Sequence, residues 1–124
     1  MRHWQAEIVR LAVGEADIRL PHSDRVTQQQ DSFHGGAVGA LADIAAGYAA
    51  MSVTPEGMEV TTVEYKINFL AACVGGELLA RGRVVRAGRR IIVTAAEVLH
   101  LGSDGRETLC ALMQQTIMPV PKTY

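Results

Sequence analysis

One carboxylate stands in a segment that is otherwise small and apolar. Asp43 is the only charged residue in the stretch 37–50, where alanine and glycine predominate. The length and composition of this stretch predict a helix. A carboxylate is costly to bury in such surroundings unless it has partners. We therefore expect Asp43 either to be paired for structure or to be held there for chemistry.

The two faces of the predicted helix differ in the size of their side chains. Positions three, four and seven residues from Asp43 share its face, and all are glycine or alanine: Gly36, Gly39, Ala40, Ala46, Gly47 and Ala50. The opposite face carries a predicted core stripe made of Val38, Leu41, Ala45 and Tyr48. We interpret the small face as a channel for a ligand, with Gly36 and Gly47 as candidate substrate-binding residues. Tight packing of the helix, with Asp43 paired for structure, is the alternative.

The start of the helix offers a second chemical group. Asp31 and Ser32 are good helix caps, and Gly35 and Gly36 follow where the first free backbone amides of the helix should lie. Such amides favour negative charge and suit an oxyanion formed during acyl transfer. Gly35 and Asp43 would be roughly 12 Å apart along the axis. If both act on one carbonyl, they must come from two copies of the chain with antiparallel helices side by side.

Length, charge and cysteine content exclude several classes of function. With 124 residues and a net charge of −1, the chain is expected to be one domain, residues 1–124, that binds neither nucleic acid nor an anionic membrane. A span over 33–53 is rejected because Asp43 would lie at its centre. The scattered histidines, and glycines that match no dinucleotide or phosphate-loop fingerprint, predict no cofactor and no metal. The lack of a signal-like start and the distant Cys73 and Cys110 predict a cytoplasmic protein with reduced thiols.

The remaining elements follow from a change of period. Residues 7–20 predict a strand pair or one bent strand with a turn at Gly14, followed by a polar loop over 21–32 and the helix over 34–51. Period-two alternation then predicts four strands joined by short turns, hence antiparallel neighbours, with Asp104-Gly105 as the strongest hairpin signal. In the first of them Thr62 shares a face with Glu64. The prediction is an α+β fold in which an antiparallel sheet of five to six strands wraps around one long central helix.

The chain resembles the hotdog-fold acyl-CoA thioesterases of the PaaI type, which include enzymes like the 4-hydroxybenzoyl-CoA thioesterases. The resemblance rests on HGGAVGALADIAAGYA, on the acid nine residues after the histidine, and on the strand series VEYKINFLAACVGGELLARGRVVRAGRRIIVTAAEV. It covers nearly the whole chain. It implies a hotdog fold and hydrolysis of an acyl-CoA substrate at a site shared by two subunits. Because an open sheet edge is an aggregation liability unless it is paired, we also expect at least a homodimer, or a homotetramer built from two dimers.

The resemblance also implies roles for individual residues. Asp43 would activate water or attack the thioester, the Gly35 amide would polarise its carbonyl, and His34 would position the carbonyl or the loop. Gln28 stands six residues before His34, where this branch often has Asn; relatives with Gln there have Glu where this chain has Asp43. Thr62 falls where a hydroxyl residue often supports the nucleophilic water. The family takes its acid and its amide from different subunits, in agreement with the helix-length argument.

Each assignment has a simpler alternative. His34 could order the loop, Gln28 could be an ordinary loop residue, and Thr62 is common in strands. Arg89 and Arg90 could bind the phosphates of coenzyme A or form a solvated hairpin tip. The alternatives for the whole protein are a non-catalytic acyl-CoA binding or sensing module, which would not need Asp43, and a hotdog hydratase or dehydratase. The sequence chooses neither the acyl group nor between nucleophilic and general-base hydrolysis.

Overall fold

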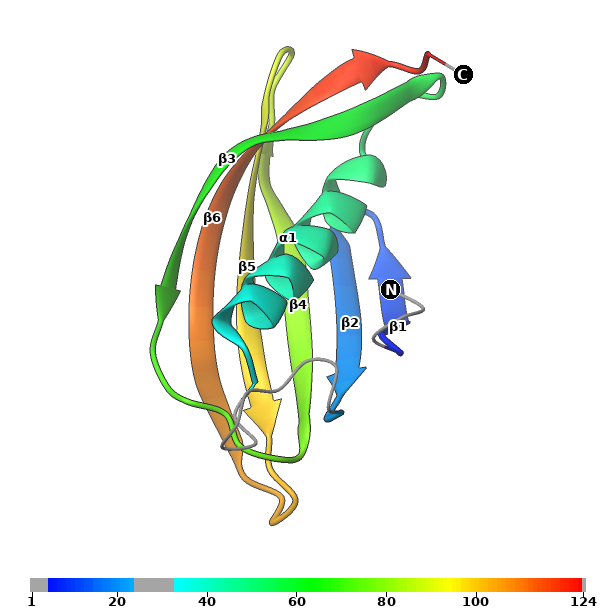
Figure 1. Ribbon diagram of the computed structural model, residues 1–124. Helices are drawn as coiled ribbons and strands as arrows, with labels where there is room; N and C mark the ends of the chain where they lie inside the picture. The colour runs from blue at the N-terminus through cyan, green and yellow to red at the C-terminus, as the bar shows by residue number, and fades with distance from the viewer. Residues whose placement is uncertain (1–4, 24–32, 124) are drawn as a thin grey trace.

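One helix and six strands make up the part of the chain that the computed structural model describes, residues 5–23 and 33–123. The strands form one curved antiparallel sheet, and the helix lies in its concave face (Figure 1). The bounds, in chain order, are β1 Glu7–Ala12, β2 Glu15–Pro21, α1 Gly35–Met51, β3 Met58–Phe69, β4 Glu77–Ala87, β5 Ile92–Leu101 and β6 Glu107–Pro121. This architecture confirms the predicted α+β fold with a wrapped central helix.

The order of the strands differs from the prediction at one place. The sheet runs β1-β2-β4-β5-β6-β3, so β3 is an edge strand that pairs with β6 and not with β4. The expectation that short turns make all consecutive strands neighbours is therefore wrong for β3 and β4. The segment 70–76 between them crosses the end of the sheet (Figure 1), which lets the β4–β5–β6 meander lie between β2 and β3. The helix α1 therefore contacts β2 towards one edge of the sheet and β3 at the other, as well as the strands between them.

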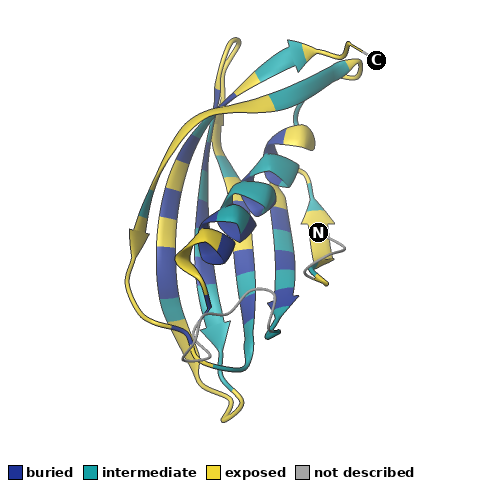
Figure 2. Ribbon diagram, viewed as in Figure 1, coloured by how far each residue is buried: buried dark blue, intermediate teal, exposed yellow. Residues whose placement is uncertain are grey.

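The helix packs closely on β4 because the facing residues are small. A Cβ atom added at Gly82 would lie 2.5 Å from the backbone carbonyl carbon of Ala45 and 2.6 Å from the nitrogen of Ala46. The inner side of the helix is buried against the sheet (Figure 2). Val38, Leu41 and Ala45 belong to this core as predicted, whereas Tyr48 is only half-buried. Close packing therefore accounts for the alanines of the inner face.

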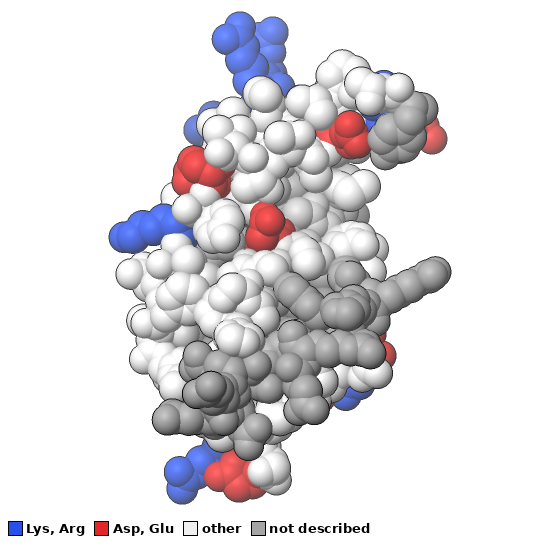
Figure 3. Space-filling view, viewed as in Figure 1, with Lys and Arg blue, Asp and Glu red and all other residues white. Residues whose placement is uncertain are grey.

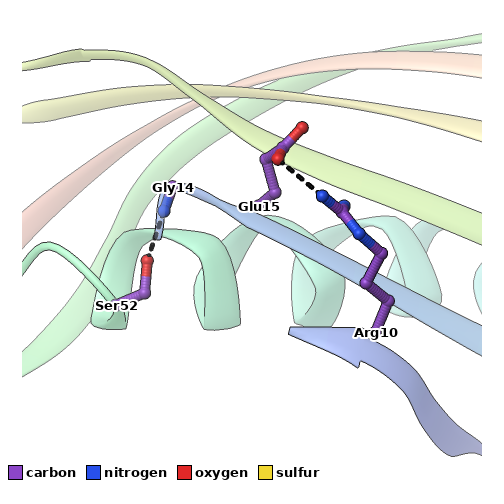
Figure 4. Close-up of polar contacts among 4 residues, drawn as sticks. All are labelled: Arg10, Gly14, Glu15 and Ser52. Atoms are coloured by element: carbon purple, nitrogen blue, oxygen red, sulfur yellow. Dashed lines mark hydrogen bonds and ion pairs between the residues drawn. The ribbon is translucent and has the colours of Figure 1, made fainter. Parts of the chain in front are cut away.

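A contact between distant segments fixes the end of the helix. Gly14, in the turn between β1 and β2, has a φ of +76° and donates its N–H to Ser52 Oγ over 2.6 Å (Figure 4). Ser52 Oγ in turn donates to the Ala49 carbonyl at 2.6 Å, and the Gly14 carbonyl accepts from the Val84 N–H at 2.8 Å. The last turn of α1 is thus tied to both β2 and β4. Arg10 and Glu15 form an exposed ion pair across the same hairpin at 2.9 Å (Figure 4).

Candidate active site

Asp43 projects from the middle of α1 towards β3 and β6, where two side chains hold one of its oxygens. Thr62 Oγ1 donates to Asp43 Oδ1 over 3.0 Å, and Gln115 Nε2 donates to the same oxygen. Gln115 Nε2 is also 3.4 Å from Thr62 Oγ1. The structure records no hydrogen bond to Asp43 Oδ2 from any residue that it describes. Among the described residues, one carboxylate oxygen is therefore anchored and the other has no partner, which is the arrangement expected of a group that meets water or a substrate.

Gln115 is a functional candidate that the sequence reasoning missed. It is fully buried on β6, and its side-chain Oε1 accepts a hydrogen bond of 2.8 Å from Thr94 Oγ1 on β5. Thr94 is fully buried too, and the two residues are paired directly across the strands. The sequence does contain a sign of its role: Gln115 is polar, yet it lies between Met113 and Ile117 on the inward face, where the alternation predicts an apolar side chain. Nothing in the sequence indicates that its partner lies 72 residues earlier.

A β-bulge brings the Thr62 hydroxyl to Asp43. The register of β3 against β6 pairs Thr62 with Ile117 and Glu64 with Thr116, which leaves Val63 as an extra residue. Ile117 is buried under the helix, so Thr62 faces inward, while Glu64 faces outward and accepts a hydrogen bond from Thr116 Oγ1 at 2.6 Å. The predicted alternation, which put Thr62 and Glu64 on one face, is wrong at this point. Bulges commonly re-aim side chains beside functional sites.

The helix N-terminus lies beside a hollow with mostly apolar walls. The helix begins at Gly35, so the N-cap position belongs to His34 and not to Asp31 or Ser32. The His34 side chain makes no capping hydrogen bond within the described residues, and it is exposed together with Gly35 and Gly36. A hollow of about 390 Å³ adjoins Gly35 and is lined by Phe33, Gly35, Val38, Phe69, Leu70, Ala71, Ala72, Cys73 and Cys110. The N–H groups at this end could donate to a developing oxyanion.

The two cysteines share the wall of this hollow and affect each other. Both are buried free thiols. The neighbouring Cys110 thiol lowers the pKa of Cys73, against an opposing effect of burial. The Cys73 sulfur and burial together raise the pKa of Cys110. The cysteines therefore lie together although they are far apart in the sequence.

A second hollow lies on the other side of Asp43 along the helix. It measures about 440 Å³ and is lined by Ile44, Gly47, Tyr48, Met51 and Val60. Gly47 leaves open space here, since an added Cβ atom would meet nothing within 4 Å, and the same holds at Gly36. Gly39 instead lies close to Tyr65, whose hydroxyl would be 3.6 Å from an added Cβ. The small face of α1 is thus open at Gly36 and Gly47 and covered by β3 between them.

Other predicted site residues lie apart from this arrangement. Arg89 and Arg90 are exposed in the turn between β4 and β5 and line neither hollow. Gln28 lies outside the described residues, so its place in the site is not defined. Where the face in Figure 3 is not drawn in grey, its centre is mostly uncharged apart from one acidic side chain, and Lys and Arg side chains project at the two ends and at the left edge.

Two last questions for the described residues are whether they could bind a metal ion and whether their helix could cross a membrane. None of their His, Cys, Asp and Glu side chains gather in a group of three or more that could hold a metal ion. Their one helix is not long and apolar enough to cross a membrane.

Comparison with known proteins identifies the family. The thioesterase superfamily model matches residues 30–104. A protein from Saccharolobus solfataricus, provisionally named an esterase, is 33% identical over 100 residues, which cover 81% of this chain and 69% of the relative. A thioesterase family protein from Silicibacter pomeroyi has a solved structure with a TM-score of 0.95 and 35% identity, covering 98% of this chain and 89% of that one.

A structure of the phenylacetic acid degradation protein PaaI from Thermus thermophilus is also similar, with a TM-score of 0.81 and 25% identity. The match covers 95% of this chain and 96% of that one. The architecture described above is thus the hotdog thioesterase fold, and the names of the relatives support a hydrolase activity. The chain belongs to the thioesterase superfamily.

Proposed function

We propose that this protein is an acyl-CoA thioesterase of the PaaI type, which hydrolyses a thioester to a carboxylic acid and free coenzyme A. The observation that carries the proposal is the geometry of Asp43. Thr62 and Gln115 hold its Oδ1, while Oδ2 receives no hydrogen bond from the described residues. A side chain kept only for structural pairing would be expected to have both oxygens engaged.

The anchored carboxylate suits either of two routes. As a general base, Oδ2 takes a proton from water, the water oxygen attacks the thioester carbon, and the C–S bond breaks to release the thiolate of coenzyme A. As a nucleophile, Oδ2 itself attacks the thioester carbon, the C–S bond breaks, and coenzyme A leaves as its thiolate. The mixed anhydride left on Asp43 is then cleaved by water, which regenerates the carboxylate and releases the carboxylic acid. In both routes the carbonyl oxygen gains negative charge, which the Gly35 amide would stabilise.

The complete site is proposed to form between two copies of the chain. Gly35 and Asp43 lie on one straight helix, roughly 12 Å apart along its axis, too far to act on one carbonyl. Two antiparallel helices side by side would place Asp43 of one protomer near Gly35 of its partner. The same arrangement would bring the hollow at Gly47 of one protomer towards the hollow at Gly35 of the other.

The remaining substrate contacts follow from the same arrangement. The open positions Gly36 and Gly47 would let the substrate approach the helix backbone. His34, exposed at the N-cap position, would position the carbonyl or the loop, and Gln28 would assist from the preceding segment. Arg89 and Arg90 would bind the coenzyme A phosphates only if their exposed turn reaches the substrate in the assembled protein.

A thiol-release screen tests the proposal. Purified protein is mixed with short, medium, long and aromatic acyl-CoAs, and free thiol is followed with a chromogenic disulfide. We expect saturable hydrolysis of at least one class. Asp43→Asn should lower kcat by ~10²–10⁴ because it removes the base or nucleophile, while circular dichroism and sedimentation stay unchanged. Wild-type kcat in this variant would contradict the role of Asp43, and tight acyl-CoA binding without turnover in the wild type would favour a binding module.

A further inference from the structure

Gln115 and Thr94 form a polar pair inside an otherwise apolar part of the sheet. Both side chains are fully buried, and the inward neighbours of Gln115 on β6 are Met113 and Ile117. Burying an amide and a hydroxyl costs free energy unless each finds a partner. A methionine at position 115 would fill the same space without that cost. The pair is therefore expected to serve something other than packing.

The hydrogen bonds of the pair give the Gln115 amide a single orientation. An ionised carboxylate only accepts hydrogen bonds, so the amide must turn Nε2 towards Asp43 Oδ1. Its oxygen Oε1 then points the other way and accepts from Thr94 Oγ1 at 2.8 Å. Thr94 is the direct cross-strand partner of Gln115 in the register of β5 and β6. The chain of donors thus runs from Thr94 through Gln115 to Asp43.

We propose that Gln115 is a positioning residue for the thioester reaction: oriented by Thr94, it holds Asp43 Oδ1 so that Oδ2 alone faces the reacting atoms. The inference rests on the function proposed above. The anchor is rigid because β5 and β6 lie inside the sheet, each paired on both sides. Thr62 makes a second contact to Oδ1, but from the edge strand β3. Gln115 therefore supplies the link between the carboxylate and the interior of the sheet.

The first experiment replaces Gln115 by an apolar residue of similar shape. Gln115→Met should keep the native dichroism spectrum and lower kcat by about 10- to 100-fold, since small displacements of a reacting group have effects of this size. KM should change less than twofold, because Gln115 does not line either hollow. The matched control is Gln114→Met, at an exposed neighbour on the other face of β6, which should retain wild-type kcat. If Gln115→Met and Gln114→Met have the same kcat, the inference is overturned.

Two further variants separate positioning from a structural role. Thr94→Val should lower kcat as Gln115→Met does, and Thr94→Ser, which keeps the hydroxyl, should restore it. In the Asp43→Asn background, Gln115→Met should leave the residual rate unchanged, because a residue that acts through Asp43 has nothing left to position. An equal fall of kcat in both backgrounds overturns the inference.

A measurement without substrate tests the anchoring of Asp43 separately from the proposed function. In ¹⁵N-labelled protein, the side-chain amide of Gln115 should exchange its protons at least tenfold more slowly than that of Gln114, and the Asp43→Asn substitution should shift its resonance. If no acyl-CoA is hydrolysed but this signature is found, the proposed function fails while the anchoring of Asp43 stands. If Gln115 exchanges as fast as Gln114, the anchoring itself is wrong.

Discussion

Thr62 is held beside Asp43 by a local irregularity of the chain. The extra residue Val63 turns Thr62 inward while Glu64 stays on the outer face. Together with Gln115, Thr62 gives Asp43 Oδ1 two donors. At the scale of single residues, the candidate site is thus one carboxylate whose orientation depends on hydrogen bonds from two different strands.

The contribution of the Thr62 hydroxyl can be measured with two neighbouring threonines. Thr62→Val should lower kcat about tenfold, because a hydrogen bond to a charged group contributes about 1.5 kcal/mol. Thr62→Ser keeps the hydroxyl and should stay near wild type. Thr61→Val, at an exposed position of the same strand, serves as the control and should have no effect on thiol release. If Thr61→Val and Thr62→Val behave alike, Thr62 has no special role.

At the scale of elements, glycine serves one purpose where α1 packs on β4 and a different one on the open side of α1. Gly82 lets the helix backbone approach the sheet, since any Cβ there would overlap the backbone of Ala45. Gly47 lies on the helix itself and faces an open hollow. The first glycine sets the distance between helix and sheet, and we expect the second to leave room for a substrate.

Alanine substitutions should separate these two purposes. Gly82→Ala should lower the free energy of unfolding by about 1–3 kcal/mol, because the helix must move away from the sheet. Gly47→Ala should raise it by about 0.5–1 kcal/mol, because alanine favours a helix interior over glycine. If Gly47 lines the substrate channel, its alanine variant should also have a higher KM. Urea unfolding and steady-state kinetics check both, and a Gly47→Ala enzyme with unchanged KM would argue against its substrate role.

At the scale of the whole molecule, we expect a second copy of the chain to cover the edge strand β3. Its outer edge makes no pairing with the described residues, and large apolar side chains are exposed on it and beside it: Val63, Tyr65, Phe69, Leu70, Leu112 and Met118. A long unpaired edge with apolar residues is an aggregation liability unless another chain covers it. We therefore predict a two-fold dimer at least, and a dimer of dimers in addition. Sedimentation equilibrium checks this, and a stable, active monomer would contradict it.

A shared site makes a quantitative prediction for mixed dimers. Asp43→Asn and Gly35→Pro should each lose most of the activity when tested alone. In a mixed dimer one site carries both lesions and the other carries neither. Full exchange of equal amounts makes about half of the dimers mixed, so roughly a quarter of all sites are intact and roughly a quarter of the wild-type activity should return. Circular dichroism of Gly35→Pro controls for damage to the start of the helix. No recovery, despite proven exchange and an intact helix, would mean that each site lies within one chain.

The sequence by itself determined the features that depend on local pattern. Periodicity and the preferences of neighbouring residues predict the helix over 34–51 with its lone Asp43, the alternating strands and the Asp104-Gly105 turn. The observed helix α1 begins one residue later. The wrapped architecture follows in turn, because one long helix must cover the sheet.

Only the tertiary structure decided which groups surround the carboxylate. Gln115 lies 72 residues after Asp43, and their contact depends on β6 lying between β5 and β3, which no local pattern specifies. The bulge at Val63 shifts the alternation by one residue, and such a shift exchanges the two faces of a strand. Strand order and register are long-range properties, because they depend on pairings between segments far apart in the chain. The sequence could therefore single out Asp43, but it could not identify the residues that orient it.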